Sequence, residues 1–289
     1  MRRRRQPRRW ALAASVLVAA LLVLAPAGPA GAVGRISAAG GYGPSWVPGR
    51  HLPVSVTVEA DRLLRGELEV TLSLAGFDGS TSRARLAVEV PGGSRKTFVV
   101  VVPPVFLPEG MQAPGATLAA RVVDGDGDAL AESDEQGLQG GGDVDLVGIL
   151  PGALTSTELP RTAPLAVDAG LARLVELTGP QLRQAPASLD PLSTVAGGPD
   201  DLAALAPSVR QGVLRWLGDG GQLLVDAAPG TVVAGLPEAW QPGPEGFGPA
   251  GLGRVRLTGG AMAAGQWDRL VEPGTTGVGG DPTFAFFGG

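Results

Sequence analysis

The sequence predicts an α+β protein of two domains, an antiparallel β-sandwich followed by an α/β domain with a mainly parallel sheet. Apolar and polar residues alternate in period two over 35–135, as in strands that have one face in water. A polar, glycine-rich linker follows at 136–142, which is typical of a domain boundary. Over 143–270, short apolar runs alternate with helix-like spacing, as in a sheet covered by helices.

The first 32 residues have the three-part pattern of a bacterial secretory signal. Six arginines lie within Met1–Arg9, an uncharged apolar stretch runs from Trp10 to Ala25, and Ala30-Gly31-Ala32 offers a cleavage site. The charged start stays in the cytoplasm while the apolar stretch enters the bilayer. We therefore expect export, with residues 1–32 acting as a cleaved signal peptide or as an N-terminal anchor. The protein would then lie on the extracytoplasmic side of the cell membrane or be secreted.

Composition restricts the function classes. Six of the 23 Lys and Arg residues and none of the 28 acidic residues precede residue 33, so the remainder carries a formal charge of −11. An acidic body argues against nucleic acid as a partner. The chain has no cysteine, which excludes disulfides, thiolate metal sites and a cysteine nucleophile. No phosphate-binding loop motif is present, and we expect no cofactor.

The first domain is expected to be an immunoglobulin-like sandwich of short antiparallel strands. Five segments carry the alternation and are separated by turns rich in Gly, Pro, Asp and Ser. They are 52–58, 67–74, 83–90, 96–102 and 116–123.

One turn in this domain has part of a calcium-loop pattern. Asp124, Asp126 and Asp128 fall at loop positions 1, 3 and 5, and Glu135 falls at position 12. Position 6 is Ala129, where the loop needs glycine, and a strand precedes the segment instead of a helix. A solvated hairpin turn is the preferred interpretation, with a calcium site as the alternative.

The second domain contains a strand–helix–strand unit. An apolar strand is predicted at 143–150, and apolar residues at helix-like spacing predict a helix over 164–177. A second helix is predicted over 207–217, beginning with proline and ending at Gly220-Gly221, with a buried strand directly after it at 222–226. Such a crossover requires parallel strands.

Residues Leu205–Pro229 resemble the signature of class I glutamine amidotransferase-like domains in bacterial surface proteins. The layout also resembles an actinobacterial membrane-protein family of unknown function, and Gly251–Leu257 with Gln266-Trp267 fits the end of its domain. The resemblance implies a flavodoxin-like sheet. Family members continue into C-terminal transmembrane helices, whereas 271–289 is expected to be a flexible tail. The chain is then either truncated or a version without those helices.

The same resemblance predicts that the domain is not an enzyme. Amidotransferases use a cysteine backed by a histidine and an acid, but this chain has no cysteine. Its single histidine, His51, lies in the other domain and is expected to be a surface or edge residue. We therefore reject glutaminase activity. The alternative is a hydrolase or small-ligand binder at the C-terminal edge of the sheet, with Ser156, Glu158, Asp190 and Asp226 as candidate residues.

These observations favour a non-catalytic extracytoplasmic envelope protein that serves as an interaction or scaffolding module. Its expected partners are an unknown envelope protein and the membrane. Contact with the membrane would come through the N-terminal segment or through the missing C-terminal helices.

Deletion of Arg2–Arg9 is expected to weaken export or to scramble orientation, because the basic start determines which end stays in the cytoplasm. A reporter enzyme that is active only outside the cytoplasm, fused after Gly289, measures the effect, with total protein followed by immunoblot. Equal external activity with and without the deletion would contradict the signal assignment.

Overall fold

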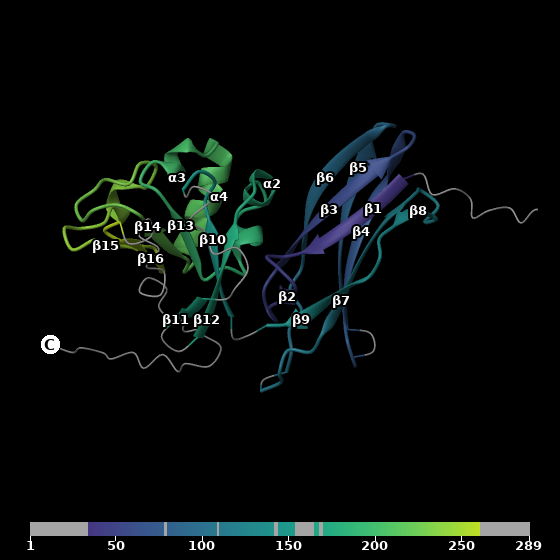
Figure 1. Ribbon diagram of the computed structural model, residues 1–289, viewed down its shortest axis with the longest axis horizontal. Helices are drawn as coiled ribbons and strands as arrows, with labels where there is room; N and C mark the ends of the chain where they lie inside the picture. Colours follow the sequence, from purple (N-terminus) through teal and green to yellow (C-terminus); the bar gives the residue numbers. More distant parts are fainter. Residues whose placement is uncertain are drawn as a thin grey trace, which may run out of the picture.

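The computed structural model describes residues 34–77, 80–108, 110–141, 144–153, 165–167 and 170–260 (Figure 1). The predicted signal, the candidates Ser156 and Glu158, and the tail at 271–289 therefore lie outside the described residues. None of the helices in the described ranges has the length and apolarity needed to cross a membrane.

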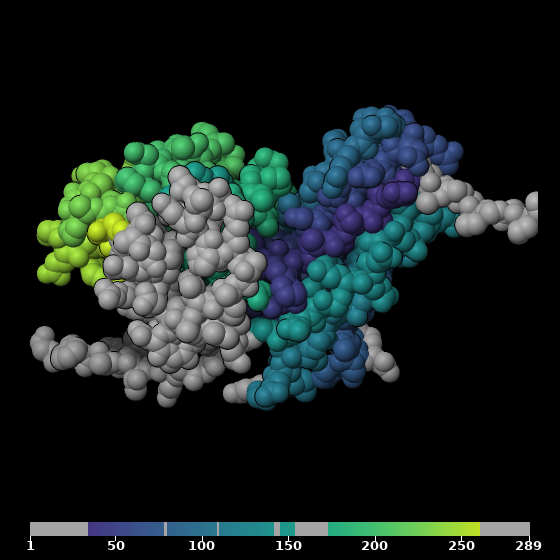
Figure 2. All heavy atoms as spheres, in the orientation of Figure 1, coloured from purple at the N-terminus to yellow at the C-terminus, as the bar shows by residue number. Residues whose placement is uncertain are grey.

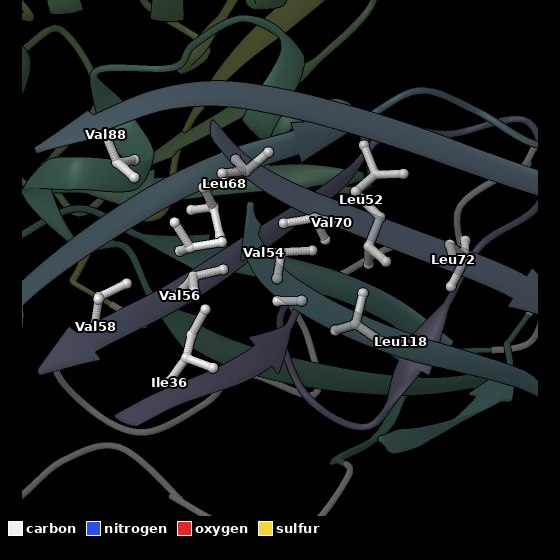
Figure 3. Packing of buried hydrophobic residues seen from close by; sticks show 14 of the residues in the cluster. Ile36, Leu52, Val54, Val56, Val58, Leu68, Val70, Leu72, Val88 and Leu118 are labelled. Carbon is white, nitrogen blue, oxygen red and sulfur yellow. The ribbon is translucent and has the colours of Figure 1, made fainter. Parts of the chain in front are cut away.

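The first domain consists of two sheets that face each other across one core (Figures 1 and 3). One sheet has the order β1-β3-β6 and the other β2-β9-β7-β4-β5, with β8 paired to β7. All pairings are antiparallel except β2 with β9. The strands are β1 (Gly34–Gly40), β2 (Ser45–Trp46), β3 (Leu52–Ala60), β4 (Leu64–Leu74), β5 (Thr81–Val90), β6 (Ser94–Val102), β7 (Ala116–Val123), β8 (Ala129–Glu132) and β9 (Gln136–Gly140).

Alternating apolar side chains from the two sheets fill this core. Val54 and Val56 of β3 and Leu68 of β4 are completely buried, and Figure 3 shows them pointing into the same interior. Each buried side chain of this size contributes about 1.5–3 kcal/mol relative to exposure. The five strands predicted from alternation are confirmed as β3 to β7.

The predicted linker at 136–142 was wrong over most of its length. Gln136–Gly140 forms β9, which pairs with β7 and buries Leu138 in the sandwich core. Glycine content suggested a flexible connection, but the backbone can still complete a sheet edge, and one apolar side chain is enough to fix its register.

The second domain contains a seven-stranded sheet with the order β11-β12-β10-β13-β14-β16-β15. The five strands from β12 to β16 in this order are parallel, and β11 and β15 pair antiparallel at the two edges. The strands are β10 (Val144–Ile149), β11 (Leu165–Val167), β12 (Gly170–Glu176), β13 (Thr194–Gly197), β14 (Gln222–Val225), β15 (Phe247–Ala250) and β16 (Gly253–Leu257).

The predicted crossover is confirmed. β13 and β14 are parallel, and the chain between them forms α3 (Asp201–Ala204) and α4 (Pro207–Gly218). Proline occupies the first turn of α4, where no backbone N–H is needed. The other helical turns of the described residues are α2 (Gly179–Leu182) and the 3-10 helices Ala187–Leu189 and Glu238–Trp240.

The helix predicted over 164–177 is absent and two strands replace it. Residues 171–176 pair in parallel with 144–149 of β10, while Val167 lies opposite Gly170 in an antiparallel pair. The apolar spacing fitted a helix, but the buried strand β10 offers backbone partners along the whole of β12. Tertiary pairing therefore overrides the local pattern.

The double glycine after α4 serves two different purposes. Gly220 has a φ of 120°, a conformation that favours glycine after a helix. At Gly221, a Cβ atom would lie 2.6 Å from the indole ring of Trp216. The strand therefore begins against the face of the buried tryptophan, and only glycine permits this approach.

We expect Trp216→Ala to lower the free energy of unfolding by about 3–5 kcal/mol through the cavity it leaves. Gly221→Val should cost about 1–3 kcal/mol, because the indole must move. Gly137→Val is the matched control, since its Cβ meets nothing within 4 Å, and it should change stability by less than about 0.5 kcal/mol. Denaturant unfolding of the full chain measures all three, and equal stability of Gly221→Val and Gly137→Val would contradict the contact.

Candidate functional site

The two domains are joined by the only tyrosine of the chain. Tyr42 lies between β1 and β2, but its side chain is 95% buried in the hydrophobic core of the second domain. Its hydroxyl donates to the backbone carbonyl of Ser188 at 2.7 Å. Burial raises the pKa of the Tyr42 phenol, so it remains a neutral donor. Figure 2 shows the residues of the two domains in direct contact.

A second contact between the domains is polar and is centred on Asp190. Its carboxylate accepts hydrogen bonds from the backbone N–H of His51 at 2.9 Å, from Nδ1 of His51 at 2.9 Å, and from the Arg50 guanidinium at 3.1 Å. Partial burial alone would raise the pKa of Asp190, but the bonds from His51 and Arg50 outweigh it and hold that pKa below its usual range. The carboxylate is therefore ionised at neutral pH.

This arrangement selects the tautomer of His51. An ionised acceptor at Nδ1 places the proton of a neutral imidazole on that nitrogen, which leaves the lone pair on Nε2. The side chain is 36% exposed, and none of the described residues forms a hydrogen bond with Nε2. His51 therefore offers an oriented hydrogen-bond acceptor.

Both domains line a cleft of about 830 Å³ next to this contact. Arg50 and His51 form the sandwich wall, and the opposite wall comes from the segment before β13, the end of α4 and the starts of β14 and β16. Its polar lining residues are Arg50, His51, Asp190, Ser193, Thr194, Asp219, Gln222 and Arg254. The cleft thus lies at the amino ends of the parallel strands, where the sandwich meets the sheet.

The two sequence candidates that lie in the described ranges, Asp190 and Asp226, do not converge. Asp190 precedes β13 at the amino end of the sheet, whereas Asp226 follows β14 at the carboxyl end and accepts a hydrogen bond from the Thr258 hydroxyl. The two carboxylates are therefore separated by the length of the strands. Ser156 and Glu158 lie outside the described residues, and their roles stay predictions.

Sequence reasoning missed the partner of His51. This residue was expected to be a surface or edge residue, and its side chain is 36% exposed, but it also pairs with an aspartate 139 positions away in the other domain. No local pattern signals this contact, because it depends on how the two domains pack. Asp190 was a candidate for the carboxyl edge of the sheet, but it precedes β13 and lies at the amino edge.

The calcium candidates form a self-contained turn. Oδ1 of Asp124 accepts the backbone N–H groups of Asp126 and Asp128, at 3.0 and 2.9 Å. These bonds are those of a solvated turn in which an aspartate caps its own backbone. The described ranges contain no cluster of three or more metal-ligating side chains.

A second charged cluster lies on the outer face of the sandwich. The Glu69 side chain is only 2% exposed and is the cross-strand partner of both Arg85 and Arg121, at 2.9 and 2.8 Å. Burial alone would raise the pKa of Glu69, but Arg121, Arg83 and Arg85 together hold it below its usual value. Both of its oxygens are paired with these arginines, so the cluster links β4 to its two neighbouring strands.

Comparison with known proteins does not place the chain in a family. No family model and no curated protein matches it. Solved structures with partial similarity include the alkylpurine DNA glycosylase AlkC of Pseudomonas fluorescens bound to DNA with an abasic-site analogue, at 14% identity, 42% of this chain, 33% of that chain and a TM-score of 0.27. CsgH of R. palustris is 19% identical, and the match covers 37% of this chain and 91% of CsgH with a TM-score of 0.21. The β-glucosidase of Kluyveromyces marxianus is 14% identical, and the match covers 36% of this chain and 15% of that enzyme with a TM-score of 0.24. The matched part spans about a third of the glycosylase. At TM-scores this low, none of these similarities bears on the function of this chain.

We expect acid to release the contact at Asp190. Because the folded-state pKa of Asp190 is lowered, its contribution is present above the usual pKa of an aspartate and is lost as the pH falls through the lowered value. Asp190→Asn should therefore cost about 1.5–3 kcal/mol at pH 7, and this cost should fall as the pH is lowered toward about 2. Denaturant unfolding at both pH values measures the difference.

Glu89→Gln is the control for this prediction, because Glu89 pairs with Arg65 on the exposed sandwich surface. It should cost less than about 1 kcal/mol at pH 7. An Asp190→Asn defect of equal size at both pH values would mean that shape, and not charge, holds the two domains together at this point.

Proposed function

We propose that the chain is an exported, non-enzymatic protein of the cell envelope that acts as an interaction module. The proposal rests on the contact between the two domains, which we call the joint. In this contact, Tyr42 of the sandwich is buried in the core of the second domain, and Asp190 of the second domain binds Arg50 and His51 of the sandwich. A sandwich and an α/β domain fixed in this way present a composite surface that neither has alone.

The fold of the second domain supports its proposed relationship to amidotransferase-like domains. Numbered along the chain, the parallel strands β12-β10-β13-β14-β16 have the spatial order 2-1-3-4-5, which is the order of flavodoxin-like sheets. The motif Leu205–Pro229 spans α4 and β14 at the centre of that unit. We infer a flavodoxin-like domain without the thiolate chemistry, since the chain has no cysteine, and an immunoglobulin-like sandwich before it.

The cleft between the domains favours a second candidate function, the binding of a small ligand. Ligand sites commonly lie at domain interfaces and have volumes of about 300–1,000 Å³, and the volume of this cleft, about 830 Å³, lies within that range. The site proposed on this basis is at the amino ends of the strands, and not at the carboxyl edge considered from the sequence.

Site-specific photocrosslinking tests the interaction module. A benzophenone amino acid at Leu252, which is 87% exposed and lines the cleft, should capture envelope material in the full-length protein expressed in its host. The matched position is Val232, which is 73% exposed and follows β14 at the other end of the sheet.

Capture at position 252, absent at 232 and abolished by Tyr42→Ala, is the expected result. Circular dichroism and thermal melting establish that Tyr42→Ala remains folded, and Arg50→Ala provides a milder variant of the same joint. Equal capture from both positions, or none from either, would contradict a recognition surface at the joint.

A further inference from the structure

We propose that the interdomain cleft is a binding site for a neutral saccharide, whose hydroxyl groups bond to Arg50, His51 and the amino ends of the sheet. This rests on the proposed use of the cleft as a recognition surface and names the chemistry of what it recognises.

The sandwich wall presents a donor and an acceptor side by side. Nε2 of His51 carries a lone pair because Asp190 holds the Nδ1 proton. One N–H group of Arg50 donates to Asp190. The other N–H groups of this half-exposed side chain remain as donors. A hydroxyl group both donates and accepts, so neighbouring hydroxyls of a sugar ring can satisfy the two side chains together.

The opposite wall has a similar pairing. Oε1 of Gln222 accepts from the Thr194 hydroxyl and from Arg254, each at 3.4 Å. The side-chain amide nitrogen of Gln222 is then left as a donor. Because Gln222 lines the cleft, this amide is a hydrogen-bond donor on the wall opposite His51.

The charges of the cleft favour a neutral ligand. Arg50 and Arg254 are matched by Asp190 and Asp219, and Asp190 is already compensated by its own contacts. A ligand with a net charge therefore gains no large excess of opposite charge. An apolar ligand would bury these polar groups without hydrogen bonds, which costs about 1–3 kcal/mol for each.

The cleft also offers an apolar surface. Its lining includes Leu252, which is 87% exposed, whereas Trp216 is only 6% exposed. Sugar rings combine hydroxyl edges with C–H faces, and the exposed Leu252 side chain can contact such a face. Because one wall comes from each domain, the site depends on the contact between the two domains.

Nuclear magnetic resonance of the sole imidazole provides a direct test, since the chain contains one histidine. The full chain is titrated with maltotriose, with triacetylchitotriose and, as a charged comparison, with citrate. At least one saccharide should shift the His51 ring resonances with a Kd of about 0.1–1 mM, whereas citrate should not.

Two variants should each weaken saccharide binding at least about fivefold, namely His51→Ala and Arg50→Ala. Arg65→Ala is the matched control, because this arginine pairs with Glu89 on the outer surface, and it should bind within about twofold of the parent. The ring nitrogen shifts of His51 in the free protein should report a proton on Nδ1, and Asp190→Asn should weaken that preference.

The inference is overturned by an absence of shifts at about 20 mM of either saccharide, by binding of citrate alone, or by saccharide binding that survives His51→Ala unchanged. If neither saccharide binds but position 252 still crosslinks, the saccharide site is wrong and the interaction module is supported with a different partner. If a saccharide binds but nothing crosslinks, the saccharide site is supported and the proposal of an envelope partner is wrong.

Discussion

The buried Tyr42 is the constraint on which the rest of this molecule depends. A tyrosine from the sandwich fills a place in the core of the second domain, and its hydroxyl finds an acceptor in the Ser188 carbonyl. Leaving that hydroxyl buried without a partner would cost about 1–3 kcal/mol. The contact is therefore directional as well as apolar. It restricts the relative orientation of the two domains more strictly than apolar burial alone would.

The polar contacts at Asp190 follow from this placement. Once Tyr42 is seated, the loop before β3 brings Arg50 and His51 to a carboxylate that precedes β13. The partly buried Asp190 is stable as an ion only because donors from the other domain reach it. Domain docking and the ionisation of this residue are thus coupled, and the coupling extends to the orientation of the imidazole.

Sequence reasoning succeeded where the information was local. Alternation at Leu52–Val58 reported a strand with one buried face, and proline, apolar stripe and double glycine bounded α4 and β14. It failed where the decisive partner was remote. Residues 170–176 became a strand because β10 was available to pair, and His51 became part of a site because the joint brings it to Asp190. Nothing in the neighbouring sequence encodes either event.

The position of the cleft follows from the same packing. In open α/β sheets, ligands commonly bind at the carboxyl ends of the strands, where loops rise above the sheet. Here a second domain is docked near the amino ends and supplies the missing wall, together with a charged donor and an oriented acceptor. The cleft at the amino ends of the strands therefore has one wall from each domain. The carboxyl end retains Asp226 with its Thr258 partner, but Arg50 and His51 lie at the other end. The polar groups of the two domains therefore combine where the domains meet, and the packing of the domains determines where the cleft lies.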